Sequence, residues 1–370
     1  MNKSRLKKIG FRFLLLVCGV LLFVYLPFLH LKKYDEMSLI YRTFIGESSE
    51  YQGMIEIWNI DTFESGTMSK TSFLESRAKV FQSKYKGLYF MIRNVTENEC
   101  FNMIDSGQRP DLFSCSYVVA ERVRDYVCAF EAQSADIYPN FLQAGKVDGL
   151  IYALPWCAGF YSLISTKEKL EKVGKYSEDV CLADVAFDSG YSYKVGKKEK
   201  TSVSLTFGAN GKLMPQNAIL AYNKNSIVQE NGVDTNAKIQ TQYSAYSKFV
   251  INEATILLGS QRDLFRIQNK QKQGKMEDVL VCPLTGYTDM VQFMMLAKNE
   301  GGLRKKYAEK FALFLVEEDS QKAVEKMGMF AVKHFLETSH EGVMRDITLG
   351  NFSDCRLFGV FDKIKEFEQS

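Results

Sequence analysis

The stretch from Gly149 to Gly174, GLIYALPWCAGFYSLISTKEKLEKVG, places the strongest constraint on how this chain can fold. Two apolar runs, each long enough for a buried strand, are separated by a proline, a tryptophan and a glycine, and a helix-like segment follows them. Proline removes a donor from a hydrogen-bonded ladder and glycine weakens a strand, so the two runs do not form one continuous central strand. We interpret the interruption as the point where the chain leaves one lobe and enters another.

A run of alternating strands and helices precedes this stretch and predicts a doubly wound α/β lobe. GMIEIW predicts a strand, KTSFLESRAKVFQSKYKG has apolar residues at helical spacing and ends at Gly87, and LYFMIR predicts the next strand. A short helix closed by Gly107 and a strand entered through Pro110 repeat the pattern. Ligands of such folds bind beyond the carboxyl ends of the strands, which here are Trp58 and residues 114–116.

A second strand that contains a proline, VLVCPL from Val279 to Leu284, indicates that the chain returns to the first lobe. The predicted boundaries assign residues 53–155 and 285–328 to lobe 1, and residues 156–284 and 329–370 to lobe 2. A chain that crosses twice builds two discontinuous lobes joined by a hinge, with a cleft between them. Closure around a ligand is a recurring motion of that architecture.

The N-terminus predicts a membrane anchor. Five basic residues precede an uncharged apolar run, Phe13 to Leu29, whose length is near the lower limit of about 17 residues for crossing a bilayer. We find no small-residue cleavage site after it, and the charge bias places the N-terminus in the cytoplasm. We therefore expect a transmembrane signal-anchor at residues 1–32, a juxtamembrane spacer at 33–52 and an extracytoplasmic body. A lipoprotein anchored through Cys18 is the alternative, although Val17 stands where a small residue is expected.

Charge and residue usage argue against several classes of function. The net charge is +3 with scattered basic residues, so no clustered basic face for nucleic acid is predicted. With three histidines in 370 residues, a metal cluster or a histidine-centred triad is poorly supported, and no phosphate-binding G-x-x-x-x-G-K-[ST] loop is present. We expect no enzymatic activity, no cofactor and no metal.

The cysteines do not predict a disulfide framework. Apart from Cys18, seven cysteines are spread without a C-x-x-C motif. An odd number cannot all pair, and spacing does not give connectivity. Buried small hydrophobic side chains are the interpretation we favour.

Five segments, in order, resemble the extracellular solute-binding proteins of ABC importers, the family 1 proteins that include the maltose-binding protein. They are GMIEIW with the following ESG loop and helix, GQRPDLFSCS, the crossover stretch itself, EATILLGSQRDLFRI, and YAEKFALFLVEEDSQKAVEKMGMFAV. The resemblance implies a two-lobed periplasmic-binding-protein-like (Venus flytrap) α/β fold. It also implies a monomer that captures a small solute, most simply carbohydrate-like, on the outer face of a bacterial membrane and delivers it to ABC transporter permease subunits.

The departures from the family pattern concern the ligand. The crossover ends in STKEKL without the usual asparagine, and the loop after LLGS carries Gln261 and Arg262 where an aromatic pair is usual. The stacking platforms of oligosaccharide binders are therefore thinned. A membrane-anchored ligand sensor or accessory protein with the same fold is the alternative function.

Four candidate ligand contacts lie in the predicted first lobe. Trp58, at a strand end, can stack on a ligand, with core packing as its other interpretation. Asp61 and Glu64 can accept hydrogen bonds from hydroxyls or an amine, or can be solvated loop carboxylates. Ser116 offers a hydroxyl and a backbone N–H at the end of another strand.

Four more candidates follow the crossover. Trp156 is expected either in the back wall of the cleft or in the packing of the hinge. Arg262, with Gln261 beside it, can clamp a carboxylate or phosphate in a bidentate way, or can form a surface salt bridge with Asp263. Tyr287 can close over the ligand or serve a structural role.

Overall fold

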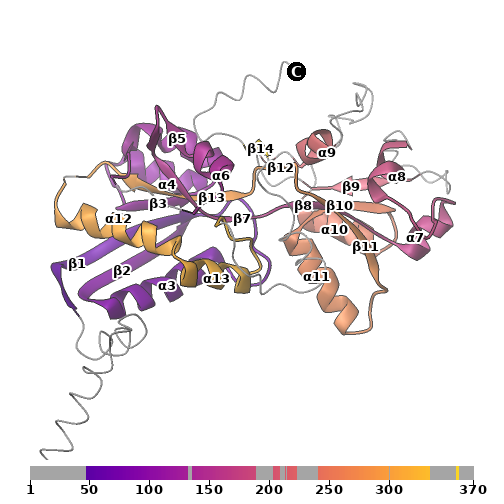
Figure 1. The fold of residues 1–370 in the computed structure, drawn as a ribbon, viewed down its shortest axis with the longest axis horizontal. Helices are drawn as coiled ribbons and strands as arrows, with labels where there is room; N and C mark the ends of the chain where they lie inside the picture. The colour runs from indigo at the N-terminus through magenta and orange to yellow at the C-terminus, as the bar shows by residue number, and fades with distance from the viewer. Residues whose placement is uncertain are drawn as a thin grey trace, which may run out of the picture. The chain divides into compact units, whose positions relative to one another are not determined.

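The fold is that of a computed structural model, which describes the ranges 47–131, 136–188, 203–208, 213, 215–222, 241–299, 301–333 and 356–357 (Figure 1). The predicted anchor at 1–32 lies outside the described residues, and so does most of the predicted spacer. Within those ranges, no helix has both the length and the apolar character needed to cross a membrane. Residues 47–53 and 79–89 form a small unit, which holds the beginning of β1 (Glu47–Ile60), the end of α3 (Lys70–Lys84) and the beginning of β2 (Tyr85–Val95). The remaining described residues form a large unit, which contains every site discussed below.

The first sheet combines strands from the beginning and the end of the chain. Its order is β2-β1-β3-β13-β4, and β7 pairs with the same β13. β1 and β3 are parallel, with Trp58 opposite Phe113, whereas β13 is antiparallel to both β3 and β7. Its strands are β1 (Glu47–Ile60), β2 (Tyr85–Val95), β3 (Leu112–Cys115), β4 (Val127–Cys128), β7 (Ala153–Ala158) and β13 (Val291–Ala297). Because β1 begins at Glu47, residues 47–52 belong to a strand, and the prediction that they are part of the spacer is wrong.

The second sheet has the order β11-β8-β10-β9. β8 lies antiparallel to β10 and to β11, and β9 is parallel to β10. Every residue of β8 is buried, including the polar side chains of Ser162, Ser165 and Thr166, so neither face of this strand is open to solvent. The strands are β8 (Tyr161–Thr166), β9 (Leu205–Phe207), β10 (Ile256–Ser260) and β11 (Val279–Leu284). Short pairs join β5 (Lys146–Val147) to β6 (Leu150–Ile151), and β12 (Tyr287–Thr288) to β14 (Arg356–Leu357).

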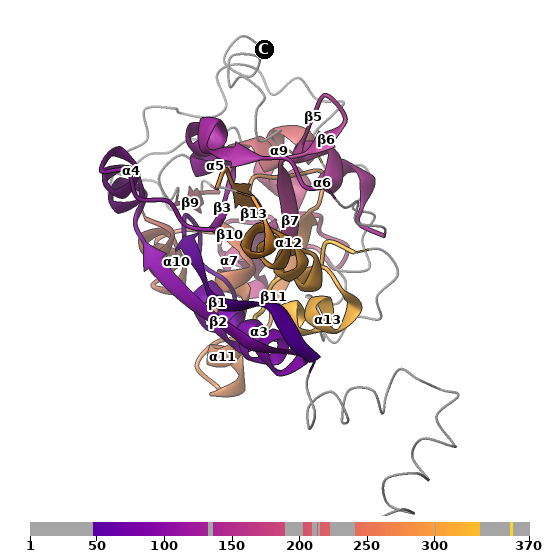
Figure 2. The ribbon, with the colours of Figure 1, turned by 90° about the vertical axis from the view of Figure 1, so that its left-hand side faces the viewer.

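Helices alternate with the strands, as the sequence pattern predicts for an α/β fold. The capping box of Thr96 and Glu99 begins α4. Near the end of the chain, α12 packs on β13 and α13 packs on β7 (Figure 2). The helices are α3 (Lys70–Lys84), α4 (Glu97–Asp105), α5 (Tyr117–Val123), η1 (Arg124–Tyr126), α6 (Pro139–Ala144), α7 (Lys167–Lys172), α8 (Leu182–Asp188), α9 (Gln216–Tyr222), α10 (Gln242–Val250), α11 (Gln261–Lys272), α12 (Leu303–Leu315) and α13 (Glu318–Lys326).

The two proline-containing strands lie in different sheets. Pro155 pairs with Phe293 in the first sheet, and Pro283 pairs with Ser162 in the second. The chain therefore passes from one sheet to the other at residues 159–160, between β7 and β8, and passes back between β11 and β13. The architecture is a two-lobed α/β fold.

Two assignments near the predicted lobe boundaries differ from the structure. Residues 156–158, predicted for lobe 2, are part of β7 in the first sheet. Phe330, also predicted for lobe 2, forms an isolated bridge with Ala158 of that same strand. The actual crossover lies slightly later than the proline because a bulge between Gln292 and Phe293 lets β7 continue past Pro155 while remaining paired with β13.

Candidate functional site

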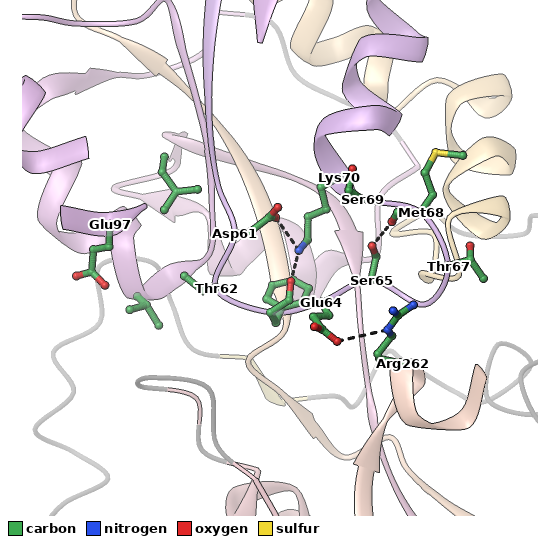
Figure 3. A pocket seen from close by; sticks show the side chains of 13 residues that line it. Asp61, Thr62, Glu64, Ser65, Thr67, Met68, Ser69, Lys70, Glu97 and Arg262 are labelled. Atoms are coloured by element: carbon green, nitrogen blue, oxygen red, sulfur yellow. Dashed lines mark hydrogen bonds and ion pairs between the residues drawn. The ribbon is translucent and has the colours of Figure 1, made fainter. Parts of the chain in front are cut away.

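A cavity of about 660 Å³ lies at the carboxyl end of β1 (Figure 3). The loop that joins β1 to α3 supplies most of its wall, and other elements add Glu97, Val118 and Arg262. The lining side chains from the last residue of β1 to the first residue of α3 are mainly polar: Asp61, Thr62, Glu64, Ser65, Thr67, Ser69 and Lys70, with Ile60, Phe63 and Met68 among them. This is the place where open α/β folds bind their ligands.

One part of the wall is a carboxylate held by a buried lysine. The Lys70 ammonium, only 1% exposed, donates to Asp61 Oδ1 at 3.0 Å and to the backbone carbonyl of Phe63 (Figure 3). The same ammonium lies 3.9 Å from the centre of the Phe63 ring. Through this ion pair the buried Lys70 ammonium orients the Asp61 carboxylate, and the Asp61 side chain remains 31% exposed at the cavity. Asp61 is thus a fixed hydrogen-bond acceptor for a ligand.

The start of α11 holds the same loop from the side of the second sheet. Gln261 Nε2 donates to the Glu64 carbonyl at 3.0 Å, and Arg262 Nη1 donates to the Gly66 carbonyl at 2.6 Å. Arg266 Nη2 donates to Glu64 Oε2 at 2.8 Å, and Arg262 Nε lies 3.3 Å from the same oxygen. Residues attached to the two sheets therefore meet at this cavity.

Glycine is required where the loop passes α11. A Cβ on Gly66 would lie 2.4 Å from a ring carbon of Phe265 and 2.6 Å from the carbonyl oxygen of Gly328. Gly328 itself has φ of +75°, a left-handed conformation that glycine adopts without strain. The two glycines and the phenylalanine ring form a close contact that sets the position of the loop.

The N-terminus of α11 is closed by a capping box. Asp263 Oδ2 accepts from the Ser260 backbone N–H at 2.9 Å, and Asp263 Oδ1 accepts from Arg266 at 3.3 Å. Burial raises the pKa of the Asp263 carboxyl above its ordinary value, although the Ser260 N–H and the Arg266 guanidinium favour the charged form. The predicted salt bridge between Arg262 and Asp263 is wrong, because Asp263 is engaged by Arg266 and Arg262 turns to Gly66 and Glu64.

Three of the eight predicted site residues line the cavity: Asp61, Glu64 and Arg262. Gln261 lies beside it, fully buried, and holds the Glu64 carbonyl rather than facing the open space. The Arg262 side chain is 33% exposed and already contacts Gly66 and Glu64, so an anionic ligand would have to share its guanidinium with these groups. The proposed anion clamp stays a prediction.

Both tryptophans lie in the core and do not line the cavity. Trp58 makes an edge-to-face contact with Phe113, with 5.8 Å between the ring centroids, and its Nε1 donates to Glu56 Oε1 at 2.8 Å. Trp156 stacks on Phe73 with 5.2 Å between ring centroids and an interplanar angle of 9°. Of the two interpretations of each residue, packing is the one that matches its position.

Ser116 and Tyr287 are also buried outside the cavity wall. Ser116 is the N-cap residue of α5, and its Oγ accepts from the Thr62 hydroxyl at 2.6 Å. The Tyr287 hydroxyl donates to Asp289 Oδ2 at 3.3 Å, and burial raises the pKa of this tyrosine far above its ordinary value. Ser116 therefore reaches the site only through Thr62, a lining residue of the loop.

Sequence reasoning missed Lys70, Thr62 and the serines of the loop. The available signal was position. Thr62 and the serines lie in the same loop after the first strand as Asp61 and Glu64, and Lys70 directly follows that loop as the first residue of α3. Glu97 was missed as well; it begins α4 and pairs with Arg122 at 2.5 Å. In the described part of the chain, no group of three histidine, cysteine, aspartate or glutamate side chains is arranged to hold a metal ion.

No protein-family model matches the sequence, and no curated protein matches it significantly. Solved structures do match the fold. A family 1 extracellular solute-binding protein from Bifidobacterium longum subsp. infantis has a TM-score of 0.59 at 14% identity, over 85% of this chain and 91% of that one. A sugar transporter from Rhizobium etli in an open conformation has a TM-score of 0.54 at 14% identity, over 84% and 90% of the two chains.

Family 1 solute-binding proteins and sugar-binding proteins are thus among the structural neighbours, which confirms the resemblance seen in the sequence at the level of the fold. Thiaminase I from Bacillus thiaminolyticus is similar too, with a TM-score of 0.54 at 13% identity, over 83% of this chain and 94% of that one. The same fold therefore occurs in binding proteins and in an enzyme, and the fold alone does not distinguish the two functions.

Proposed function

We propose that this protein is an extracytoplasmic solute-binding protein, anchored by residues 1–32, that captures a small solute and delivers it to an ABC importer. The observation that carries the proposal is the cavity at the carboxyl end of β1. Its wall combines the loop from the first sheet with Arg262 from the start of α11, which follows β10 of the second sheet. A ligand in this cavity touches residues that move with each sheet.

This arrangement supports a mechanism of hinge closure. The chain crosses between the sheets at residues 159–160 and again between β11 and β13, and those short connections can change their dihedral angles while each sheet stays intact. A ligand that bonds to both sides of the cavity binds the closed form more tightly than the open form. It shifts the population by that difference in affinity, and no chemical step on the ligand is required.

The polar lining favours a solute rich in hydroxyl groups. Asp61 and Glu64 carry carboxylate oxygens that accept hydrogen bonds, and Thr62, Thr67 and Ser69 add hydroxyls that donate or accept. The cations of the wall, Lys70 and Arg262, already bond to protein oxygens. A carbohydrate-like solute satisfies such a lining better than a small anion. Structural neighbours described as sugar-binding proteins support this choice.

A ligand screen tests the proposal. The purified full chain in detergent is heated with sugars, peptides and organic anions, and each hit is titrated by calorimetry. We expect a sugar to raise the melting temperature, and Asp61→Asn to weaken its binding by about tenfold, as the loss of one charge-assisted hydrogen bond predicts. Trp58→Phe, a buried position outside the cavity, is the matched control and should leave the affinity unchanged.

Two results would contradict this function. If Trp58→Phe weakened binding and Asp61→Asn did not, the ligand would bind elsewhere. If the ligand recovered after incubation were chemically altered, the protein would be an enzyme, as its structural neighbour thiaminase I is by name.

A further inference from the structure

Three backbone segments are bonded to one another at the first crossover. The Gly159 N–H donates to the Met290 carbonyl at 2.7 Å, and the Thr288 hydroxyl donates to the Gly159 carbonyl at 2.6 Å. One residue earlier, the backbone groups of Ala158 and Phe330 bond to each other in both directions, at 3.0 and 2.8 Å. The crossover is therefore tied to the return segment before β13 and to the segment after α13, and a rotation at Gly159 involves all three.

The Gln261 side chain lies against this junction. A Cβ on Gly159 would lie 2.6 Å from Gln261 Oε1, 2.8 Å from Nε2 and 2.9 Å from Cδ, so the amide group packs directly on the glycine backbone. The same Nε2 donates to the Glu64 carbonyl at 3.0 Å and lies 3.3 Å from Met329 Sδ. One amide thus contacts the crossover, the loop that forms the cavity wall and the segment after α13.

The stability of the core does not explain a glutamine at this position. Gln261 is fully buried, and its Oε1 has no hydrogen-bond partner among the described residues. An unbonded buried oxygen is unfavourable, and a methionine would fill a similar volume without one. The bond from Nε2 to Glu64 does explain the glutamine, because it joins α11 of the second lobe to the cavity wall of the first.

We propose that Gln261 is a positioning residue that couples the hinge at Gly159 to the cavity wall at Glu64. The assignment rests on the hinge closure of the proposed function. The amide contacts Gly159 and Glu64 at once, so its bond to the Glu64 carbonyl forms only at hinge angles that leave room for it beside Gly159. Because the bond joins the two lobes, it stabilises the closed form and is lost on opening.

This coupling also explains the glycine of the crossover. Gly159 does not have a positive φ, so glycine is needed there for space and not for a left-handed backbone. Any side chain at this position would displace the Gln261 amide from its place between the crossover and the loop. The glycine that separates the two apolar runs in the sequence is thus the residue on which Gln261 packs.

Single-molecule fluorescence tests the coupling on the purified full chain in detergent, with no solute added. Dyes are attached through non-natural residues at Glu121 of α5 and Lys175 after α7, two exposed positions in different lobes. Gln261→Met keeps the packing and removes the donor. We expect its ratio of closed to open molecules to fall by about two- to tenfold, as the loss of one hydrogen bond predicts, while its melting temperature stays close to that of the wild-type chain. Gln273→Met, at the exposed C-cap of the same helix, is the matched control and should change neither quantity.

Gly159→Ala should lower the same ratio, because its methyl group displaces the amide, and it should also lower the melting temperature. The double variant Gly159→Ala with Gln261→Ala should recover the melting temperature without recovering the ratio, since the clash and the bond are both gone. This pair of variants serves if Gln261→Met fails to fold. An unchanged ratio in Gln261→Met would overturn the assignment, as would an equal fall in Gln273→Met or a single distance in every variant.

Failure of this coupling and failure of the proposed function are separate results. A solute that closes Gln261→Met as readily as the wild-type chain would leave solute capture intact and remove the role of Gln261. A chain that binds nothing in the ligand screen, but whose closed fraction still falls in Gln261→Met, would keep the coupling and lose the solute-binding function.

Discussion

Arg266 of α11 donates to Glu64 of the loop after β1 across 2.8 Å, and this ion pair joins two segments that are far apart in the chain. Arg262 approaches the same carboxylate at 3.3 Å. Glu64 also lines the cavity, so one side chain is both part of the cavity wall and the acceptor that attaches α11 to it. A change at Glu64 should therefore affect the closure of the two-lobed fold more than its stability.

Glu64→Gln should lower the free energy of unfolding by less than about 1 kcal/mol, because the carboxylate is 51% exposed and water screens the pair. Urea denaturation measures this effect, which should shrink further at high salt. Glu168→Gln, which removes the exposed Glu168–Lys172 pair, is the control for loss of a surface charge. Small-angle scattering should show a more open average form for Glu64→Gln and no change for the control. A large loss of stability would contradict a role in closure.

Lys70→Met should be the most damaging change at the site. It removes a buried ammonium that bonds to Asp61 and to the Phe63 carbonyl, and the two oxygens lose their partner. Removal of one member of a buried pair costs about 3–5 kcal/mol, and the partial exposure of Asp61 reduces this to about 2–3 kcal/mol.

The double variant Lys70→Met with Asp61→Asn should recover part of that loss, since no uncompensated charge remains. Urea unfolding of the single and double variants measures the coupling. Equal stability of Lys70→Met and the wild-type chain would show that the ammonium does not hold Asp61 in solution.

Asp263 should make the free energy of unfolding depend on pH. Burial raises the pKa of its carboxyl in the folded state, so the native protein holds this proton more tightly than the unfolded chain does. The resulting stabilisation is fully present below the unfolded pKa of about 3.9 and is lost as pH rises through the folded pKa. Asp263→Asn has no titrating carboxyl group at this position, so its free energy of unfolding should not show this decrease with rising pH. Unfolding free energies measured from pH 4 upward for both proteins test it, and identical pH profiles would contradict the assignment.

The sequence predicted the fold through local patterns. Alternating strand and helix periods and the interrupted run around Pro155 are properties of short segments, and they gave the α/β class and the first crossover. The loop after β1 was found in the same way, because it follows a strand end, and Asp61 and Glu64 both line the cavity.

Tertiary contacts explain what the sequence did not reveal. Trp156 looked like a cleft wall, but its ring is covered by Phe73 from a distant helix, and no local pattern predicts that stack. Lys70 looked like an ordinary first residue of a helix, although Asp61 and Phe63 bury it. Arg262 turned to Glu64 rather than to its sequence neighbour Asp263 because the loop from the other sheet reaches it.

Gly66→Ala tests whether the close contact of the loop with α11 sets the cavity wall. The added methyl group would lie 2.4 Å from the Phe265 ring and 2.6 Å from the Gly328 carbonyl, so the loop or the ring must move. We expect a loss of about 1–3 kcal/mol in urea unfolding and weaker binding of any solute found in the screen. Gly301→Ala, where nothing lies within 4 Å of the new Cβ, is the control and should be neutral. Phe265→Leu should relieve the clash and restore part of the stability of Gly66→Ala, since the two changes share one contact. If Gly66→Ala were as stable and as active in binding as the wild-type chain, the loop would be free to shift away from α11, and the cavity wall would not depend on this contact.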